Sequence, residues 1–144
     1  MRIFLSVLAL VAVSACSSPS DEVTPDTAPQ GFRGIGEAEV ITFTGTEPFW
    51  GGTVRRDTLV WRTPENTMDG ATGQSIDVER FYGQGGIAFS GQLDGRPFDM
   101  MVTPGACSDG MSDRTYPYTV TVKVGDRQLE GCASTDRQPA TDKP

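Results

Sequence analysis

Apolar and polar residues alternate with a period of two through most of the chain. The clearest case is residues 118–124, where Tyr118, Val120, Val122 and Val124 alternate with Thr119, Thr121 and Lys123. Shorter stretches with the same pattern lie at 40–44, 59–61, 76–81, 87–89 and 98–102, and Leu129 precedes Gly131-Cys132. Because successive side chains of a strand point to opposite faces, this pattern predicts strands with one buried face.

Short turn sequences separate these stretches. Asp94-Gly95 indicates a two-residue hairpin, since a type I′ turn needs positive φ at both central positions, and Gly125-Asp126 suits a type II′ turn. Arg56-Asp57, Asp69-Gly70 and Gly85-Gly86 mark further turns. Such short connections predict an antiparallel meander of about seven or eight strands. A meander of this size cannot leave long edges exposed, so we predict an all-β fold closed into a small barrel, with a two-sheet sandwich as the alternative.

The N-terminus has the features of a bacterial lipoprotein precursor. Arg2 is followed by an apolar run from Ile3 to Val13, which is shorter than the roughly 20 residues that span a bilayer but fits a signal peptide. Val13-Ser14-Ala15-Cys16 resembles a lipobox. We therefore predict that residues 1–15 are a signal peptide and that Cys16 becomes the lipidated N-terminus, held in the membrane by its acyl chains. An ordinary secretory signal that contains a cysteine is the alternative.

Composition divides the remaining chain into three parts. Residues 16–36 are rich in Ser, Pro, Thr and Asp and predict a flexible tether. Residues 37–133 form the predicted β domain, and residues 134–144 a disordered tail. Ser17, which follows the lipidation site, favours the outer membrane, with the domain facing the periplasm.

Charge and missing residue types exclude several functions. The chain has a net charge of −7, so it is not expected to bind nucleic acid through phosphates, whereas a basic protein partner would be attracted. It has no histidine, which removes Ser-His-Asp and Cys-His catalysis and imidazole zinc sites. We expect a monomer that needs no cofactor. Outside the cytoplasm, Cys107 and Cys132 favour a disulfide over a metal or redox pair.

Two motifs are candidate functional sites. In GTEPFW, residues 45–50, adjacent Phe49 and Trp50 are expected to point to opposite faces of a strand. Either Pro48 starts a strand whose aromatics fill one end of the barrel, or Glu47 and the outward aromatic form a binding surface.

The second motif is CSDGMSDRTYPY, residues 107–118. Asp109 and Asp113 would share a side of a helical turn and suggest a metal site or an acid–base pair. The alternative, which we favour, is a structural turn in which Asp and Ser accept backbone N–H bonds, Gly110 relieves the backbone, and Arg114 pairs with Asp109 or Asp113.

These motifs, with the closing Gly131-Cys132, resemble an uncharacterised family of bacterial envelope lipoproteins with small β domains. Some relatives are joined to modules of the kind seen in membrane-bound inhibitors of c-type lysozyme. The resemblance covers residues 37–133 and implies a Cys107–Cys132 disulfide. It marks as signature positions Glu47, Trp50, Ser108, Asp109, Met111, Ser112, Asp113 and Arg114, without assigning them an activity.

The sequence therefore predicts a lipid-anchored, non-enzymatic module that binds an envelope component. A specific version is an inhibitor of a lysozyme-like hydrolase, an enzyme class that is usually basic. The alternatives are a barrel that holds a small apolar ligand and a hydrolase that uses Asp109 and Asp113.

Overall fold

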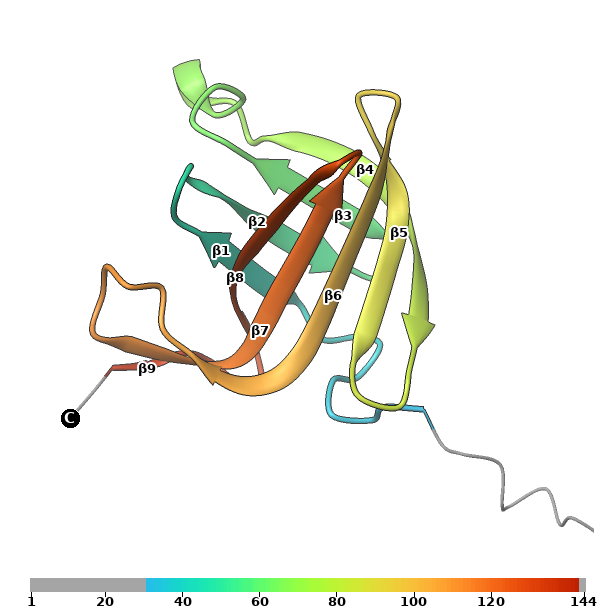
Figure 1. Ribbon diagram of the computed structural model, residues 1–144, viewed down its shortest axis with the longest axis vertical. Helices are drawn as coiled ribbons and strands as arrows, with labels where there is room; N and C mark the ends of the chain where they lie inside the picture. The colour runs from blue at the N-terminus through green and yellow to red at the C-terminus, as the bar shows by residue number, and fades with distance from the viewer. Residues whose placement is uncertain (1–30, 143–144) are drawn as a thin grey trace, which may run out of the picture.

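The computed structural model describes residues 31–142 and is a closed antiparallel β-barrel (Figure 1). The predicted all-β barrel is confirmed, whereas the signal peptide, Cys16 and residues 16–30 lie outside the described residues. The strands are β1 (Ile41–Gly45), β2 (Trp50–Arg55), β3 (Thr58–Arg62), β4 (Gln74–Tyr82), β5 (Ile87–Leu93), β6 (Arg96–Cys107), β7 (Arg114–Val124), β8 (Arg127–Thr135) and β9 (Thr141–Asp142), with a 3-10 turn η2 (Met68–Gly70). Within residues 31–142, no helix is long and apolar enough to cross a bilayer.

Each of the strands β1 to β7 pairs with the next one along the chain, and β8 returns to pair with β1. At this closing seam Phe43 of β1 lies opposite Ala133 of β8. The two-residue turns form as predicted: Asp94 and Gly95 both have positive φ, and Gly125 has φ 59°. Closure pairs every edge of the meander and removes the sites at which another chain could add a strand.

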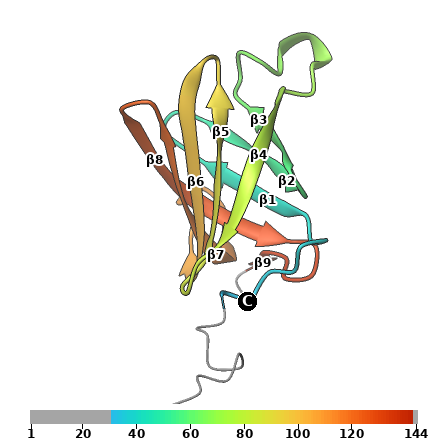
Figure 2. The ribbon, with the colours of Figure 1, turned by 90° about the vertical axis from the view of Figure 1, so that its right-hand side faces the viewer.

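In a meander, successive connections lie at alternate ends of the barrel (Figure 2). The β1–β2, β3–β4, β5–β6 and β7–β8 connections surround one end, which we call the mouth. The β2–β3, β4–β5 and β6–β7 connections lie at the other end, together with residues 31–40 and β9. The segment that leads toward Cys16 therefore joins the barrel at the end opposite the mouth.

Inward-facing side chains fill the barrel. The predicted alternation is confirmed, and the interior face of β7 buries Tyr118, Val120, Val122 and Val124. An aromatic cluster occupies the half nearer the mouth: Phe43 lies beside both Trp50 and Trp61, which stack with ring centroids 5.3 Å apart. In a barrel of about eight strands the interior is just wide enough for its own side chains.

Arg80 closes the end opposite the mouth. Its guanidinium lies 5.2 Å from the ring centroid of Phe89 and donates hydrogen bonds to the carbonyls of Glu37 and Arg56. Ile35, which the composition assigns to the flexible tether, is buried with 1% exposure, and the Gly34 carbonyl accepts a bond from Tyr118 Oη. The predicted tether boundary at residue 36 therefore differs from the structure, in which residues 31–36 pack on the barrel.

The C-terminal segment also differs from its prediction as a disordered tail. β8 continues to Thr135, which is 3% exposed, and β9 pairs with Arg114–Thr115 of β7. The Gln138 side chain donates to the Gly34 carbonyl at 2.9 Å. Polar composition suggested disorder here, but these backbone and side-chain bonds attach the segment to the barrel.

Candidate functional site

The second motif forms an arm that leaves the barrel wall, which we define as residues 105–116. Beyond the pair Pro104–Tyr118, the register of β6 and β7 shifts before Cys107 pairs with Tyr116. Two residues of β6 thus lie opposite the single residue Pro117 of β7, an arrangement called a β-bulge. Bulges bend strands and increase their twist. Proline has no N–H to donate to the ladder. Pro104 and Pro117 therefore lie where the regular barrel pairing ends and the arm begins.

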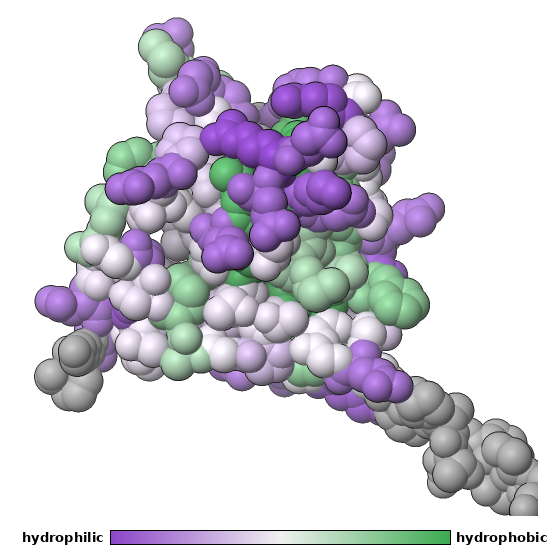
Figure 3. Space-filling model, viewed as in Figure 1, coloured by the Kyte–Doolittle hydropathy of each residue, from purple (hydrophilic) through white to green (hydrophobic). Residues whose placement is uncertain are grey.

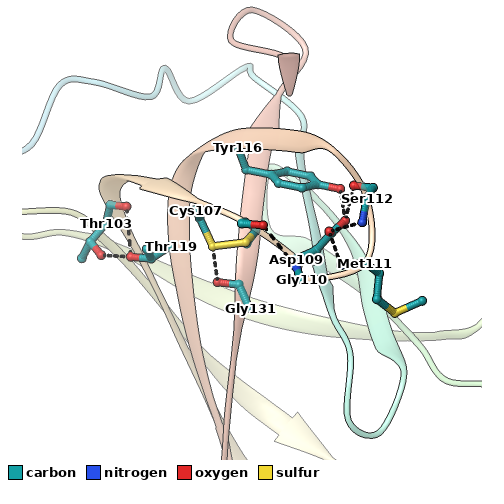
Figure 4. Close-up of a disulfide and its surroundings, with 11 residues drawn as sticks. Thr103, Cys107, Asp109, Gly110, Met111, Ser112, Tyr116, Thr119 and Gly131 are labelled. Atoms are coloured by element: carbon teal, nitrogen blue, oxygen red, sulfur yellow. Dashed lines mark hydrogen bonds between the residues drawn. A yellow bond between two sulfur atoms is a disulfide. The ribbon is translucent and has the colours of Figure 1, made fainter. Parts of the chain in front are cut away.

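Asp109 organises the tip of the arm (Figure 4). Its Oδ1 accepts the backbone N–H groups of Met111 and Ser112 at 3.0 and 2.8 Å. Its Oδ2 accepts the Ser112 hydroxyl at 2.8 Å and the Tyr116 hydroxyl at 3.1 Å. Gly110, with φ 72°, lets the chain turn around the carboxylate. The favoured structural interpretation of this segment agrees with this geometry, in which both carboxylate oxygens are occupied.

These hydrogen bonds shift the pKa values of two groups. Bonds from the backbone N–H and hydroxyl of Ser112, and then from the Met111 N–H, hold the pKa of Asp109 well below its ordinary value. Burial, followed by the bond to Asp109, raises the pKa of Tyr116. Asp109 is therefore ionised at neutral pH and is not a proton donor there.

We expect the pKa of Asp109 to lie below its ordinary value of 3.8 in the folded protein. A depressed folded pKa means that the network stabilises the arm above the unfolded-state pKa and is lost as the pH falls through the folded one. The chemical shift of the Asp109 carboxyl carbon, followed by NMR, measures the titration. A midpoint at or above the ordinary value would contradict the network.

A disulfide attaches the base of the arm to the barrel. Cys107 is bonded to Cys132 of β8, with Cα atoms 5.6 Å apart, so the predicted pair is confirmed. Cys132 is buried with 1% exposure and lies in the closing seam, opposite Thr44 of β1. The covalent bond therefore links the arm to the seam that closes the barrel.

A groove of about 400 Å³ lies between the arm and the outer faces of β7, β8 and β1. Its lining includes Thr44, Thr46, Thr119, Thr121, Asp109 and Glu130. This arm groove exposes polar and apolar surface in similar amounts and carries negative charge from its two acidic residues. It therefore suits a basic or hydroxyl-rich contact from another molecule.

The remaining arm residues have distinct positions. The Ser108 hydroxyl accepts the Gly110 N–H at 3.2 Å, and Met111 is 66% exposed at the tip. Asp113 is exposed and takes no part in the Asp109 network. Arg114 was predicted to pair with Asp109 or Asp113, and this is wrong, because its Nε lies 3.3 Å from Asp142 of β9. The tip of the arm is not a helical turn, so Asp109 and Asp113 do not lie on one side of a helix as the sequence predicted.

The first motif is divided between two regions. Gly45 and Thr46 border the arm groove, and Glu47 is exposed in the turn. Phe49 is 57% exposed and Trp50 only 5%, so the two adjacent side chains point in opposite directions, as predicted. The strand starts at Trp50 and not at Pro48. Trp50 is thus a core residue, and the outward aromatic is Phe49.

The mouth contains a second concavity, of about 420 Å³. Trp50 and Trp61 lie at its base, and Arg96 and Arg127 are on its rim. Hydrophilic side chains gather over this end of the barrel, with apolar atoms visible between them (Figure 3). Sequence reasoning missed the two arginines, although each directly follows a predicted hairpin turn.

The arrangement restricts the chemistry of the arm. Among residues 31–142, no cluster of three or more His, Cys, Asp or Glu side chains is placed to hold a metal. Asp109 and Asp113 do not form the acid–base pair considered from the sequence, because Asp109 is fixed by four donors and Asp113 lies outside that network.

Comparison with protein-family models, curated proteins and solved structures finds no match to this chain.

Proposed function

We propose that the protein is a lipid-anchored module of the bacterial envelope that binds another protein through the arm and the arm groove. The observation that carries this proposal is the internal bonding of the arm. Asp109 accepts four hydrogen bonds within the loop, and the disulfide fixes its base, while Met111 at the tip remains 66% exposed. A loop that is ordered before binding loses less conformational entropy when a partner docks.

Charge indicates the kind of partner. The groove carries the carboxylates of Asp109 and Glu130, and the whole chain has a net charge of −7. Complementary charge raises association rates and selects partners. A basic envelope protein fits this surface, and a lysozyme-like hydrolase is the specific version proposed from the sequence.

The lipid anchor fits the position of the N-terminal segment. About 15 residues separate Cys16 from Gly31, which allows a reach of roughly 50 Å in extended form. The barrel joins this segment at the end opposite the mouth. A lipidated Cys16 would therefore hold the domain within roughly 50 Å of the membrane.

Site-specific photocrosslinking in intact cells tests the proposed contact surface. A photoreactive amino acid at position 111 is expected to give a discrete protein adduct. The same residue at position 81 serves as a matched control, because Met111 and Phe81 are 66% and 68% exposed and lie on different parts of the molecule. Position 81 is expected to give no such adduct.

An adduct at both positions or at neither would contradict the proposal. Identification of the partner by mass spectrometry then tests the narrower version. A lysozyme-like hydrolase that purified protein inhibits would support it, and absence of inhibition of c-, g- and i-type lysozymes would rule it out. Metabolic labelling with a radioactive fatty acid, which should label the wild-type protein and not Cys16→Ser, tests the anchor separately.

A further inference from the structure

The mouth of the barrel has the dimensions of a ligand site and takes no part in the contact surface proposed for the arm. Its volume is about 420 Å³, within the roughly 300–1,000 Å³ that is usual for small-molecule pockets. Connections from four pairs of strands surround it, and the opposite end of the barrel is closed by Arg80 and residues 31–40. A ligand would therefore enter from one side only.

The base and walls of the mouth combine apolar and polar side chains. The indoles of Trp50 and Trp61 stack on each other and are 5% and 6% exposed, so little of their surface is open to the mouth. Leu93, Val124 and Leu129 come from the facing strands, and Phe49 stands 57% exposed at the edge. Such a lining offers an aromatic ligand the ring of Phe49 and partial burial of its apolar area.

Two cations lie on the rim. Arg96 begins β6 and Arg127 begins β8, directly after the hairpin turns. A hydrogen bond from the Gly125 N–H to the Pro97 carbonyl, at 2.9 Å, ties these two hairpins together. The guanidinium groups are thus carried by connected rather than independent loops.

The rim also carries two acids, which already have partners. Asp94 accepts the Gln74 side-chain amide at 2.9 Å and lies 4.0 Å from Arg96. A hydrogen bond from the Thr63 side chain is the main cause that lowers the pKa of Glu65. Among the described residues, Arg127 makes no ion pair. The cation left without a counter-charge is therefore Arg127.

We propose that the mouth binds a small aromatic carboxylate, with its ring packed against Phe49 above Trp50 and Trp61 and its carboxylate at Arg127, supported by Arg96. A planar guanidinium can bond a carboxylate through two parallel N–H groups. The net charge of −7 repels anions at long range, so recognition depends on these short-range contacts.

Both tryptophans of the chain lie in the mouth, so their indole N–H signals in a proton–nitrogen NMR spectrum report on this site directly. The sample is the predicted mature chain, residues 16–144, with Cys16→Ser, in which neither a lipid nor the signal peptide competes for apolar probes. Naphthoate, naphthalenemethanol and naphthylmethylammonium share a ring system and differ in charge. Naphthoate is expected to shift both indole signals and to bind about tenfold more tightly than the other two probes.

Variants separate the charge from the apolar contacts. Arg127→Gln is expected to weaken naphthoate binding about tenfold and to leave the affinity for naphthalenemethanol unchanged. Phe49→Ala should weaken the binding of both probes. Lys123→Gln, which removes an exposed cation from the outer face of β7, is the matched control and should change neither. The dispersion of the backbone signals verifies that each variant is folded.

Indole signals that none of the probes moves would overturn the site. Equal affinity for the three probes, tighter binding of the ammonium, or unchanged naphthoate affinity in Arg127→Gln would overturn the anion assignment. None of these results depends on the arm or on Cys16, so the outcome is independent of the photocrosslinking test.

Discussion

Replacing Trp50 by alanine is expected to lower the free energy of unfolding by about 3–5 kcal/mol. Trp50 is 5% exposed and stacks on Trp61, and its ring lies so close to Gly45 that a Cβ at position 45 would collide with it. Removing the indole deletes this packing and leaves space that the strands around it cannot fill. Urea unfolding followed by far-ultraviolet circular dichroism measures the loss.

Phe49→Ala is the matched control, since it removes an aromatic ring from the adjacent residue. Phe49 is 57% exposed, and we expect a change within about 0.5 kcal/mol. Similar losses for the two variants would mean that the inward and outward residues of the motif are assigned incorrectly. The comparison also decides between a folding role and a contact role for the signature position Trp50.

Removing the disulfide with Cys107→Ala and Cys132→Ala together is expected to destabilise the protein by about 3 kcal/mol in the chain-entropy model. The bond closes a loop with a sequence separation of 25, so its loss increases the freedom of the unfolded chain. It also releases the arm from β8. The free energy of unfolding, measured with and without a reducing agent, provides the test.

The wild-type protein should lose the same stability when it is reduced, whereas the double variant should not respond to the reducing agent. A wild-type unfolding midpoint that reduction leaves unchanged would show that the bond does not form or does not constrain the unfolded state. Faster amide exchange at Met111 and Ser112 in the reduced protein would place the loosening in the arm.

The strands and hairpins could be predicted because they depend on local signals. Alternation in residues 118–124 fixes which face of β7 is buried, and Asp94-Gly95 and Gly125-Asp126 specify the turns that join its neighbours. Closure into a barrel followed from the need to cover strand edges. The register of β1 against β8, with Phe43 opposite Ala133, could not be predicted, because the two strands are distant in sequence and share no local signal.

The sites were harder to predict because they depend on tertiary placement. Asp109 and Asp113 have the same chemistry and similar neighbours in sequence, but only Asp109 turns inward to the N–H groups and hydroxyls around it. Arg80 occupies an inward position of β4, where polarity alone suggests exposure. The polar composition of residues 136–142 hid the pairing of β9 with the arm.

The arm and the mouth both depend on the pairing of β1 with β8, which closes the barrel and positions Cys132. Nuclear Overhauser effects across this seam test the claim most directly. We predict contacts between the backbone protons of Phe43 and Ala133, together with slow amide exchange along β1. Absence of these contacts, with rapid exchange of the N–H groups of β1 that face β8, would show an open sheet or a sandwich and would contradict the account.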